Sequence, residues 1–133
     1  MATMTSTAAK TKKVKVMRQV SQGCAFIQAT YNNTIITVTD LNGNTLAWSS
    51  AGACGFRGPK KATPYAASMI VKAIADKVKD SGLKELNVFV TGVGSGRDSA
   101  VRAFNANGFH VNQIKDITPL PHNGCRASRP RRV

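Results

Sequence analysis

Residues 86–108 read LNVFVTGVGSGRDSAVRAFNANG, a short apolar run followed by a glycine-rich turn and an amphipathic segment. The run from Leu86 to Thr91 predicts a β-strand. A helix is predicted to begin at Ser95, where Asp98 three residues later would complete a capping box, and to end at Gly108. Because a strand joined to a helix by a short turn is half of a parallel crossover, this stretch predicts a fold of the α/β class.

The segments on either side continue the same alternation. Downstream, His110–Ile117 predicts a further strand. Upstream, Thr63 followed by Pro64 is typical of a helix start, and Gly82 is typical of its end. The apolar residues between these signals recur at helical spacing: Ala67, Ile70, Val71, Ile74 and Val78. We therefore expect parallel strands connected by helical crossovers.

Before the first predicted helix, three segments predict an antiparallel meander: Cys24–Tyr31, Thr34–Thr39 and Thr45–Ser50. The first segment alternates, with one face formed by Ala25, Ile27, Ala29 and Tyr31. The second is β-branched throughout, so we expect it to be buried on both faces. Asn32-Asn33 and Asn42-Gly43 predict the two reversals. The expected fold is α/β, a mixed five-stranded sheet between flanking helical layers.

The charge of the chain predicts an anionic partner. Lys and Arg number 19 against 6 Asp and Glu over 133 residues, a formal net charge of +13. Nucleic acid is the commonest partner of such a surplus, with a membrane surface or a solvated face as the alternatives. No acid precedes Asp40 or follows Asp116. We therefore expect a basic, flexible N-terminal arm (1–22), an α/β core domain (23–117) and an extended basic RNA-binding tail (118–133).

Two glycine-rich loops precede the predicted helices. Residues 92–97 read GVGSGR, and residues 52–61 read GACGFRGPKK. Glycine lets the backbone approach a phosphate closely, and a helix N-terminus offers unpaired N–H groups. Arg97 would add a fork of donors suited to a phosphate. Both loops should lie at the carboxyl ends of strands, where open α/β sheets bind their ligands.

Other interpretations of these loops stay open. A glycine-rich turn can serve chain reversal alone. Phe56 is expected to pack under its own loop, with stacking on a base as the alternative. The dinucleotide fingerprint fails because Arg97 stands where that fold needs glycine, and the P-loop motif is absent.

The tail begins with TPLPHNGCR (residues 118–126) and continues with further arginines. Its prolines limit the conformational freedom lost on docking, and arginine binds phosphate through two hydrogen bonds. His122 has no acid or nucleophile near it in sequence, so we expect a hydrogen bond to RNA and not general-base catalysis.

Several other classes of protein are disfavoured. A two-metal nuclease needs converging carboxylates, and only Asp40 and Asp116 end predicted strands. Three cysteines without a C-x-x-C pair do not predict a zinc site. No helix-turn-helix or zinc finger indicates a DNA-binding module, and no apolar run fits a signal peptide or a membrane span. We therefore expect a cytoplasmic protein with no catalytic residue, metal, cofactor or small-molecule substrate.

Four motifs resemble the bacterial-type eleventh protein of the small ribosomal subunit, a universal family: YNNT (31–34), SAGACGFRG (50–58), TPYAA (63–67) and DITPLPHNGCR (116–126). The resemblance covers residues 24–133. The chain departs from the family at Val93 and Ser95, where prolines are common, and at Ala127-Ser128, which replaces prolines after the Cys-Arg pair. Neither departure removes a charge.

The resemblance implies a ribonuclease-H-like sheet without nuclease activity. It also implies a structural place on the platform of the 30S subunit in cytoplasmic ribosomes, with an organellar ribosome as the alternative. There the family binds 16S-type ribosomal RNA, helps shape the cleft that holds the messenger and Shine-Dalgarno helix, and takes part in translation. The implied neighbours are the seventh, eighteenth and twenty-first proteins of the small subunit.

The residues expected to contact RNA lie in the N-terminal arm, the first reversal, the two glycine-rich loops and the tail. They are Lys12, Lys13, Lys15, Arg18, Asn32, Asn33, Gly52, Gly55, Phe56, Arg57, Gly58, Lys60, Lys61, Gly92, Gly94, Gly96, Arg97, His122, Asn123, Gly124, Arg126, Arg129, Arg131 and Arg132.

Overall fold

The computed structural model describes residues 19–132, so the predictions for Lys12, Lys13, Lys15 and Arg18 lie outside the described residues. The helices and strands come in the predicted order. They are β1 (Gln22–Ala29), β2 (Thr34–Asp40), β3 (Thr45–Ser50), the 3-10 helix η1 (Gly58–Ala62), α1 (Pro64–Val78), the 3-10 helix η2 (Lys79–Ser81), β4 (Glu85–Thr91), α2 (Gly96–Ala106) and β5 (His110–Asp116).

The five strands form one mixed sheet in the order β3-β2-β1-β4-β5. β2 runs antiparallel to β1 and β3, and β4 runs parallel to β1 and β5. The central strand β1 therefore joins the antiparallel half of the sheet to the parallel half. The predicted α/β fold with a mixed five-stranded sheet and flanking helices is confirmed.

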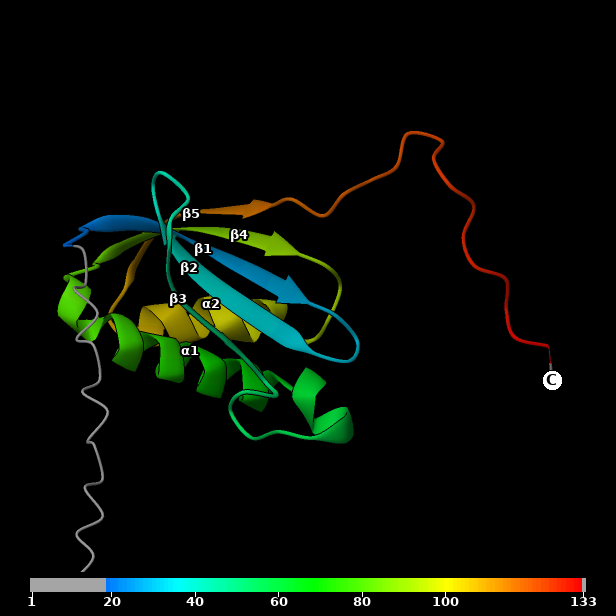
Figure 1. The fold of residues 1–133 in the computed structure, drawn as a ribbon, viewed down its shortest axis with the longest axis horizontal. Coiled ribbons are helices and arrows are strands. Elements are labelled where there is room, and N and C mark those ends of the chain that lie inside the picture. Colours follow the sequence, from blue (N-terminus) through cyan, green and yellow to red (C-terminus); the bar gives the residue numbers. More distant parts are fainter. Residues whose placement is uncertain (1–18, 133) are drawn as a thin grey trace, which may run out of the picture.

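Both α-helices lie on the same face of the sheet (Figure 1). α1 packs against α2, β2 and β3, and α2 packs against β1 and β5. The chain moves across the sheet in one direction from β3 to β4 to β5, and right-handed crossovers in one direction place their helices on one face. The expectation of a helical layer on each side of the sheet is therefore wrong. The core lies between this face and the helices, around Ile36, Ile70 and Phe104.

The one-sided cover also changes the environment of β2. Ile36 and Val38 point toward the helices and are fully buried, whereas Ile35 on the other face is 36% exposed. The expectation that this strand is buried on both faces is therefore wrong. Its β-branched residues reflect strand propensity more than burial.

The first reversal is built by side-chain hydrogen bonds. The hydroxyl of Thr30 accepts hydrogen bonds from the backbone N–H groups of Asn32 and Asn33, at 3.3 and 3.0 Å. Neither asparagine has positive φ, so the reversal is confirmed without the left-handed conformation that these residues tolerate. β1 ends at Ala29, and Tyr31 lies beyond it with 79% of its surface exposed, so the prediction that Tyr31 continues the strand face of Ala25, Ile27 and Ala29 is wrong.

The two helix starts differ from each other. The Thr63 hydroxyl accepts a hydrogen bond from the Ala66 N–H at 3.3 Å, and Pro64 is the first helical residue, as predicted. At α2 the capping box is wrong, because the Ser95 hydroxyl makes no cap bond and donates instead to the carbonyl of Ala62. Ser95 thus ties the start of α2 to the end of η1.

Candidate nucleic-acid interface

Four of the segments expected to contact RNA meet at one end of the sheet. β1, β3, β4 and β5 all run in the same direction, so their carboxyl ends lie together (Figure 1). The segments that leave these ends are the reversal at residues 30–33, the loop and 3-10 helix at residues 51–63, the loop at residues 92–95 and the tail at residues 117–132. We call this surface the carboxyl-end surface. The predicted position of both glycine-rich loops at strand carboxyl ends is confirmed.

The loop at residues 92–95 packs directly on the end of β1. The Gly94 N–H donates a hydrogen bond to the carbonyl of Ala29 at 3.1 Å. A Cβ atom at Gly92 would lie 2.1 Å from that same carbonyl oxygen, and one at Gly94 would lie 2.4 Å from the carbonyl oxygen of Thr30. Because a real Cβ cannot fit at such distances, these two glycines are required by the packing of the chain itself.

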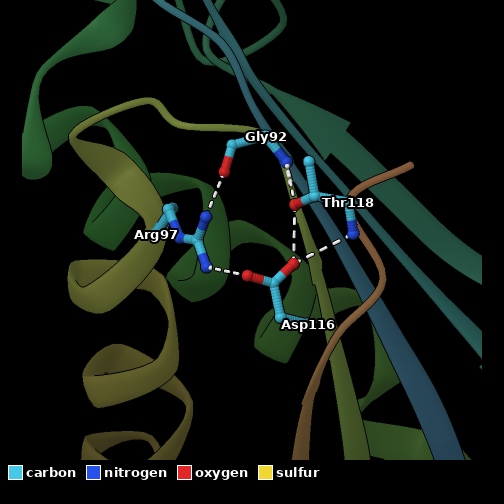
Figure 2. Close-up of polar contacts among 4 residues, drawn as sticks. All are labelled: Gly92, Arg97, Asp116 and Thr118. Carbon is cyan, nitrogen blue, oxygen red and sulfur yellow. Dashed lines mark hydrogen bonds and ion pairs between the residues drawn. The ribbon is translucent and has the colours of Figure 1, made fainter. Parts of the chain in front are cut away.

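The side chain of Arg97 is held by the chain. Its guanidinium Nη2 lies 2.7 Å from the carboxylate oxygen Oδ2 of Asp116, and Nη1 donates to the carbonyl of Gly92 (Figure 2). The sequence predicts a phosphate-binding guanidinium here, whereas in the structure this group joins the start of α2 to the end of β5.

The same carboxylate also fixes the first residue of the tail. Asp116 Oδ1 accepts hydrogen bonds from the N–H and the hydroxyl of Thr118, at 2.9 and 2.6 Å, and the Gly92 N–H donates to that hydroxyl at 3.1 Å (Figure 2). These bonds, led by the one from the Thr118 side chain and followed by the one from Arg97, hold the pKa of Asp116 well below its ordinary value. We call Gly92, Arg97, Asp116 and Thr118 the tail-root network.

Sequence reasoning did not find the tail-root network. From the sequence, Asp116 is predicted only to end a strand and Thr118 only to begin the tail. The available signal was the Asp-x-Thr spacing, which lets a carboxylate accept from the backbone N–H two residues later.

The loop at residues 51–63 is stabilised by its own arginine and phenylalanine. Arg57 Nη1 donates to the carbonyls of Gly52 and Phe56, at 3.0 and 3.2 Å. The Phe56 ring is half-buried against the core and packs edge-on against Tyr65, with ring centroids 5.9 Å apart. The packing of Phe56 agrees with an anchor under its own loop. Lys60 of η1 is exposed.

Beyond Thr118 the tail leaves the body as an extended segment (Figure 1). All of its side chains from residue 119 to residue 132 are exposed. The predicted contact residues of the tail are therefore accessible: His122, Asn123, Gly124, Arg126, Arg129, Arg131 and Arg132. Asn123 adopts a φ of 57°, the only positive φ of a non-glycine residue within 19–132.

The carboxyl-end surface is strongly cationic. Residues 51–63 and 117–132 contain seven lysines and arginines and no acid: Arg57, Lys60, Lys61, Arg126, Arg129, Arg131 and Arg132. Two carboxylates lie at the edge of this surface: that of Asp116, which is paired with Arg97, and that of the exposed Asp98 in the first turn of α2. Because the exposed guanidinium and ammonium groups outnumber them, the surface can neutralise a polyanion.

The geometry gives no support to a metal-dependent nuclease. Asp40 pairs with Gly23 at the start of β1, whereas Asp116 pairs with Val90 near the end of β4, so the two lie at opposite ends of the sheet. Among residues 19–132, no three His, Cys, Asp or Glu side chains gather closely enough to hold a metal ion. Over the same residues, none of the helices has the length and apolar character needed to cross a membrane.

Comparison with known proteins places this chain in a family. The family model described as Ribosomal protein S11 matches residues 23–132. A protein named Small ribosomal subunit protein uS11 from Treponema pallidum (strain Nichols) is 53% identical over 125 residues, which cover 94% of this chain and 99% of that protein. Its namesake from Buchnera aphidicola subsp. Cinara cedri (strain Cc) is 51% identical over 121 residues, which cover 91% of this chain and 93% of that protein. With its fold, its motifs and these matches in agreement, the chain belongs to the ribosomal protein S11 family.

Proposed function

We propose that this chain is a structural component of the small ribosomal subunit that binds 16S-type ribosomal RNA through its carboxyl-end surface and its tail. The observation that carries the proposal is the meeting of cationic segments 51–63 and 117–132 at one end of the sheet. The two relatives are named as proteins of the small ribosomal subunit, and their identity to this chain of 51% and 53% supports a place in the small subunit for this chain as well. Family membership also makes the chain a structural protein and not an enzyme.

The mode of binding follows from the side chains. The arginines of the tail would each bind phosphate oxygens through two hydrogen bonds, while Lys60 and Lys61 would act as point charges beside the loop. The tail-root network would give the tail a fixed starting point, so that less conformational freedom is lost when the arginines dock. The N-terminal arm, with Lys12, Lys13, Lys15 and Arg18, would add further phosphate contacts.

Within the subunit we propose a place on the platform, next to the cleft that holds the messenger and Shine-Dalgarno helix. The proposed neighbours are the seventh, eighteenth and twenty-first small-subunit proteins, in a cytoplasmic ribosome. The similarity of the tail motif at residues 116–126 to that of the family supports this position.

The direct test is binding of the purified chain to a central-domain fragment of 16S ribosomal RNA over a range of salt concentrations. We expect a steep salt dependence, because each neutralised phosphate releases counterions. Removal of residues 126–133 eliminates four arginines. The negative slope of log K against log salt should then become less steep by about 3, since each neutralised phosphate contributes roughly 0.7 to 0.9. Equal affinity for duplex DNA, or an unchanged slope, would contradict the proposal.

A further inference from the structure

The sheet face opposite the helices carries a row of aromatic side chains. The strand register places five residues side by side across β3, β2, β1, β4 and β5: Trp48, Thr37, Phe26, Phe89 and Lys115. Trp48 is 56% exposed and Phe26 is 39% exposed. The rings of Phe26 and Phe89 stack with their centroids 5.2 Å apart and their planes 15° apart. We call these five residues the aromatic row, and both α-helices lie on the other face of the sheet (Figure 1).

The rows on either side of the aromatic row are mainly polar, with Ile35 of β2 and Cys24 of β1 as their apolar members. Toward the carboxyl ends of the strands, Gln28 of β1 lies opposite Thr91 of β4. Toward the amino ends, Asn87 of β4 lies opposite Gln113 of β5. A carboxamide offers both donors and an acceptor in one plane, and the threonine hydroxyl offers both as well. Aromatic rings flanked by such groups suit a flat ligand with hydrogen-bonding edges.

The charges around the aromatic row favour an anionic ligand. At the β3 side, Lys77 Nζ donates to the carbonyl of Trp48 at 2.9 Å and lies 6.0 Å from the centre of the Trp48 ring. At the β5 side the row ends in the exposed Lys115. The row and its two polar neighbours contain no acid. The Glu85 carboxylate lies one row further toward the amino ends and accepts hydrogen bonds from Gln22 and Asn112.

We propose that this open face binds a single-stranded segment of RNA by stacking unpaired bases on Trp48 and on the Phe26–Phe89 pair. Neighbouring strands lie about 4.8 Å apart, so Trp48 and Phe26, separated by one strand, are about 10 Å apart along the row. This distance gives two separate stacking positions, as on other sheets that bind unpaired bases through aromatic residues. The amides would bind the edges of the bases, and Lys77 and Lys115 would lie near the phosphates.

This inference rests on the RNA-binding function proposed above but uses a different surface and different chemistry. The carboxyl-end surface neutralises phosphates and needs no bases. The aromatic row needs bases and would bind poorly to a chain of phosphates alone. The two can therefore be tested independently.

Trp48 is the only tryptophan of the chain, so its fluorescence reports directly on the aromatic row. Titration of the full chain with an adenylate hexaribonucleotide at low salt should quench this fluorescence to saturation. A hexamer that lacks the bases but keeps the sugars and phosphates should leave the fluorescence unchanged. The double variant Phe26→Leu/Phe89→Leu keeps apolar side chains on the strands and should weaken binding of the hexamer at least tenfold. Tyr65→Leu removes an exposed aromatic ring on α1, away from the row, and should not change it.

The proposal is overturned if the adenylate hexamer causes no quenching, if the hexamer without bases quenches equally, or if Phe26→Leu/Phe89→Leu binds as the native chain does with an unchanged circular dichroism spectrum.

The alternative ligand of such a face is a protein. Photo-cross-linking of intact small subunits should give nucleotide adducts on peptides containing Phe26 or Trp48, and adducts to protein alone would also overturn the proposal. Arg129→Ala/Arg131→Ala separates the two surfaces: it should weaken binding of the 16S fragment yet keep the quenching at saturating hexamer. Unchanged affinity for the 16S fragment in that variant would contradict the proposed function of the carboxyl-end surface and would leave the proposal for the aromatic row intact.

Discussion

Arg97 and Asp116 form an ion pair in which the guanidinium Nη2 lies 2.7 Å from the carboxylate Oδ2. The pair joins the first turn of α2 to the last residue of β5, and Thr118 binds to the other oxygen of the same carboxylate. The glycine-rich loop at residues 92–95 and the start of the tail, which are distant in sequence, are therefore joined at the carboxyl end of the sheet. The start of the tail is therefore held in place by the folded body of the protein.

Asp116→Asn should loosen the start of the tail. The amide cannot replace the charge that binds Arg97, and one of its two polar groups cannot accept a hydrogen bond from Thr118. We expect faster hydrogen exchange at the amides of Gly92 and Thr118 and a few-fold weaker affinity for the 16S fragment, with little change in global stability because the pair is exposed. Asp76→Asn makes the same change of charge on the outer side of α1 and should alter neither measurement. Unaltered exchange in the Asp116 variant would show that the carboxylate does not hold the tail.

The tail-root network should survive mild acid. The pKa of Asp116 is lowered from 3.8 by hydrogen bonds from the Thr118 side chain and from Arg97. A carboxylate whose pKa is lower in the folded state stabilises that state above the unfolded-state pKa, and this contribution is lost as pH falls through the folded-state pKa. We expect Asp116 to stay charged at pH 4 in an NMR titration of its side-chain carboxyl carbon. Thr118→Val should raise the midpoint toward the ordinary value; a midpoint near that value in the native chain would contradict the network.

Gly94→Ala should destabilise the fold. The added Cβ would lie 2.4 Å from the carbonyl oxygen of Thr30, which belongs to the backbone and cannot rotate away. Such overpacking costs about 1 to 3 kcal/mol, which urea denaturation can measure. Gly52→Ala is the matched control in the other glycine-rich loop, where the nearest atom to the added Cβ lies 3.9 Å away. Equal stability of the two variants would contradict the close packing of the loop against β1.

Thr34→Val should stabilise the fold. The Thr34 hydroxyl is fully buried at the start of β2 and has no hydrogen-bond partner among residues 19–132. Because valine has the same shape without the unpaired polar atom, the free energy of unfolding should rise by about 1 kcal/mol. Thr37→Val makes the same change at a half-buried residue on the open face of the same strand and should change stability much less. Destabilisation of the Thr34 variant would indicate that its hydroxyl has a partner.

The periodic segments could be predicted from sequence because local physics determines them. The alternation around Ile27 corresponds to β1, and the helical spacing of Ile70 and Ile74 corresponds to α1. Gly82, with positive φ, follows η2, which continues α1, and Gly108, also with positive φ, lies two residues after the end of α2. The carboxyl-end surface could also be anticipated, since parallel strands bring their following loops to one end of the sheet.

The features that could not be predicted from the sequence depend on tertiary contacts. Ser95 looked like a helix cap but donates to Ala62 across a gap of 33 residues, and Arg97 looked free for phosphate but pairs with Asp116. Both side chains have partners supplied by segments that only the folded sheet brings near. The placement of both helices on one face depends on strand order, which local patterns do not encode. The aromatic row was missed for the same reason, because its members come from different strands.

The central position of β1 has a consequence for how the chain folds during its own synthesis. β1 is bonded on one side to β2, which follows at once, and on the other side to β4, whose last residue is Thr91. When the meander leaves the exit tunnel, one flank of β1 still has open N–H and C=O groups, because β4, which pairs with them, has not yet emerged. This flank of β1 therefore stays open to other strands until β4 has emerged, and the five-stranded sheet can form only after that.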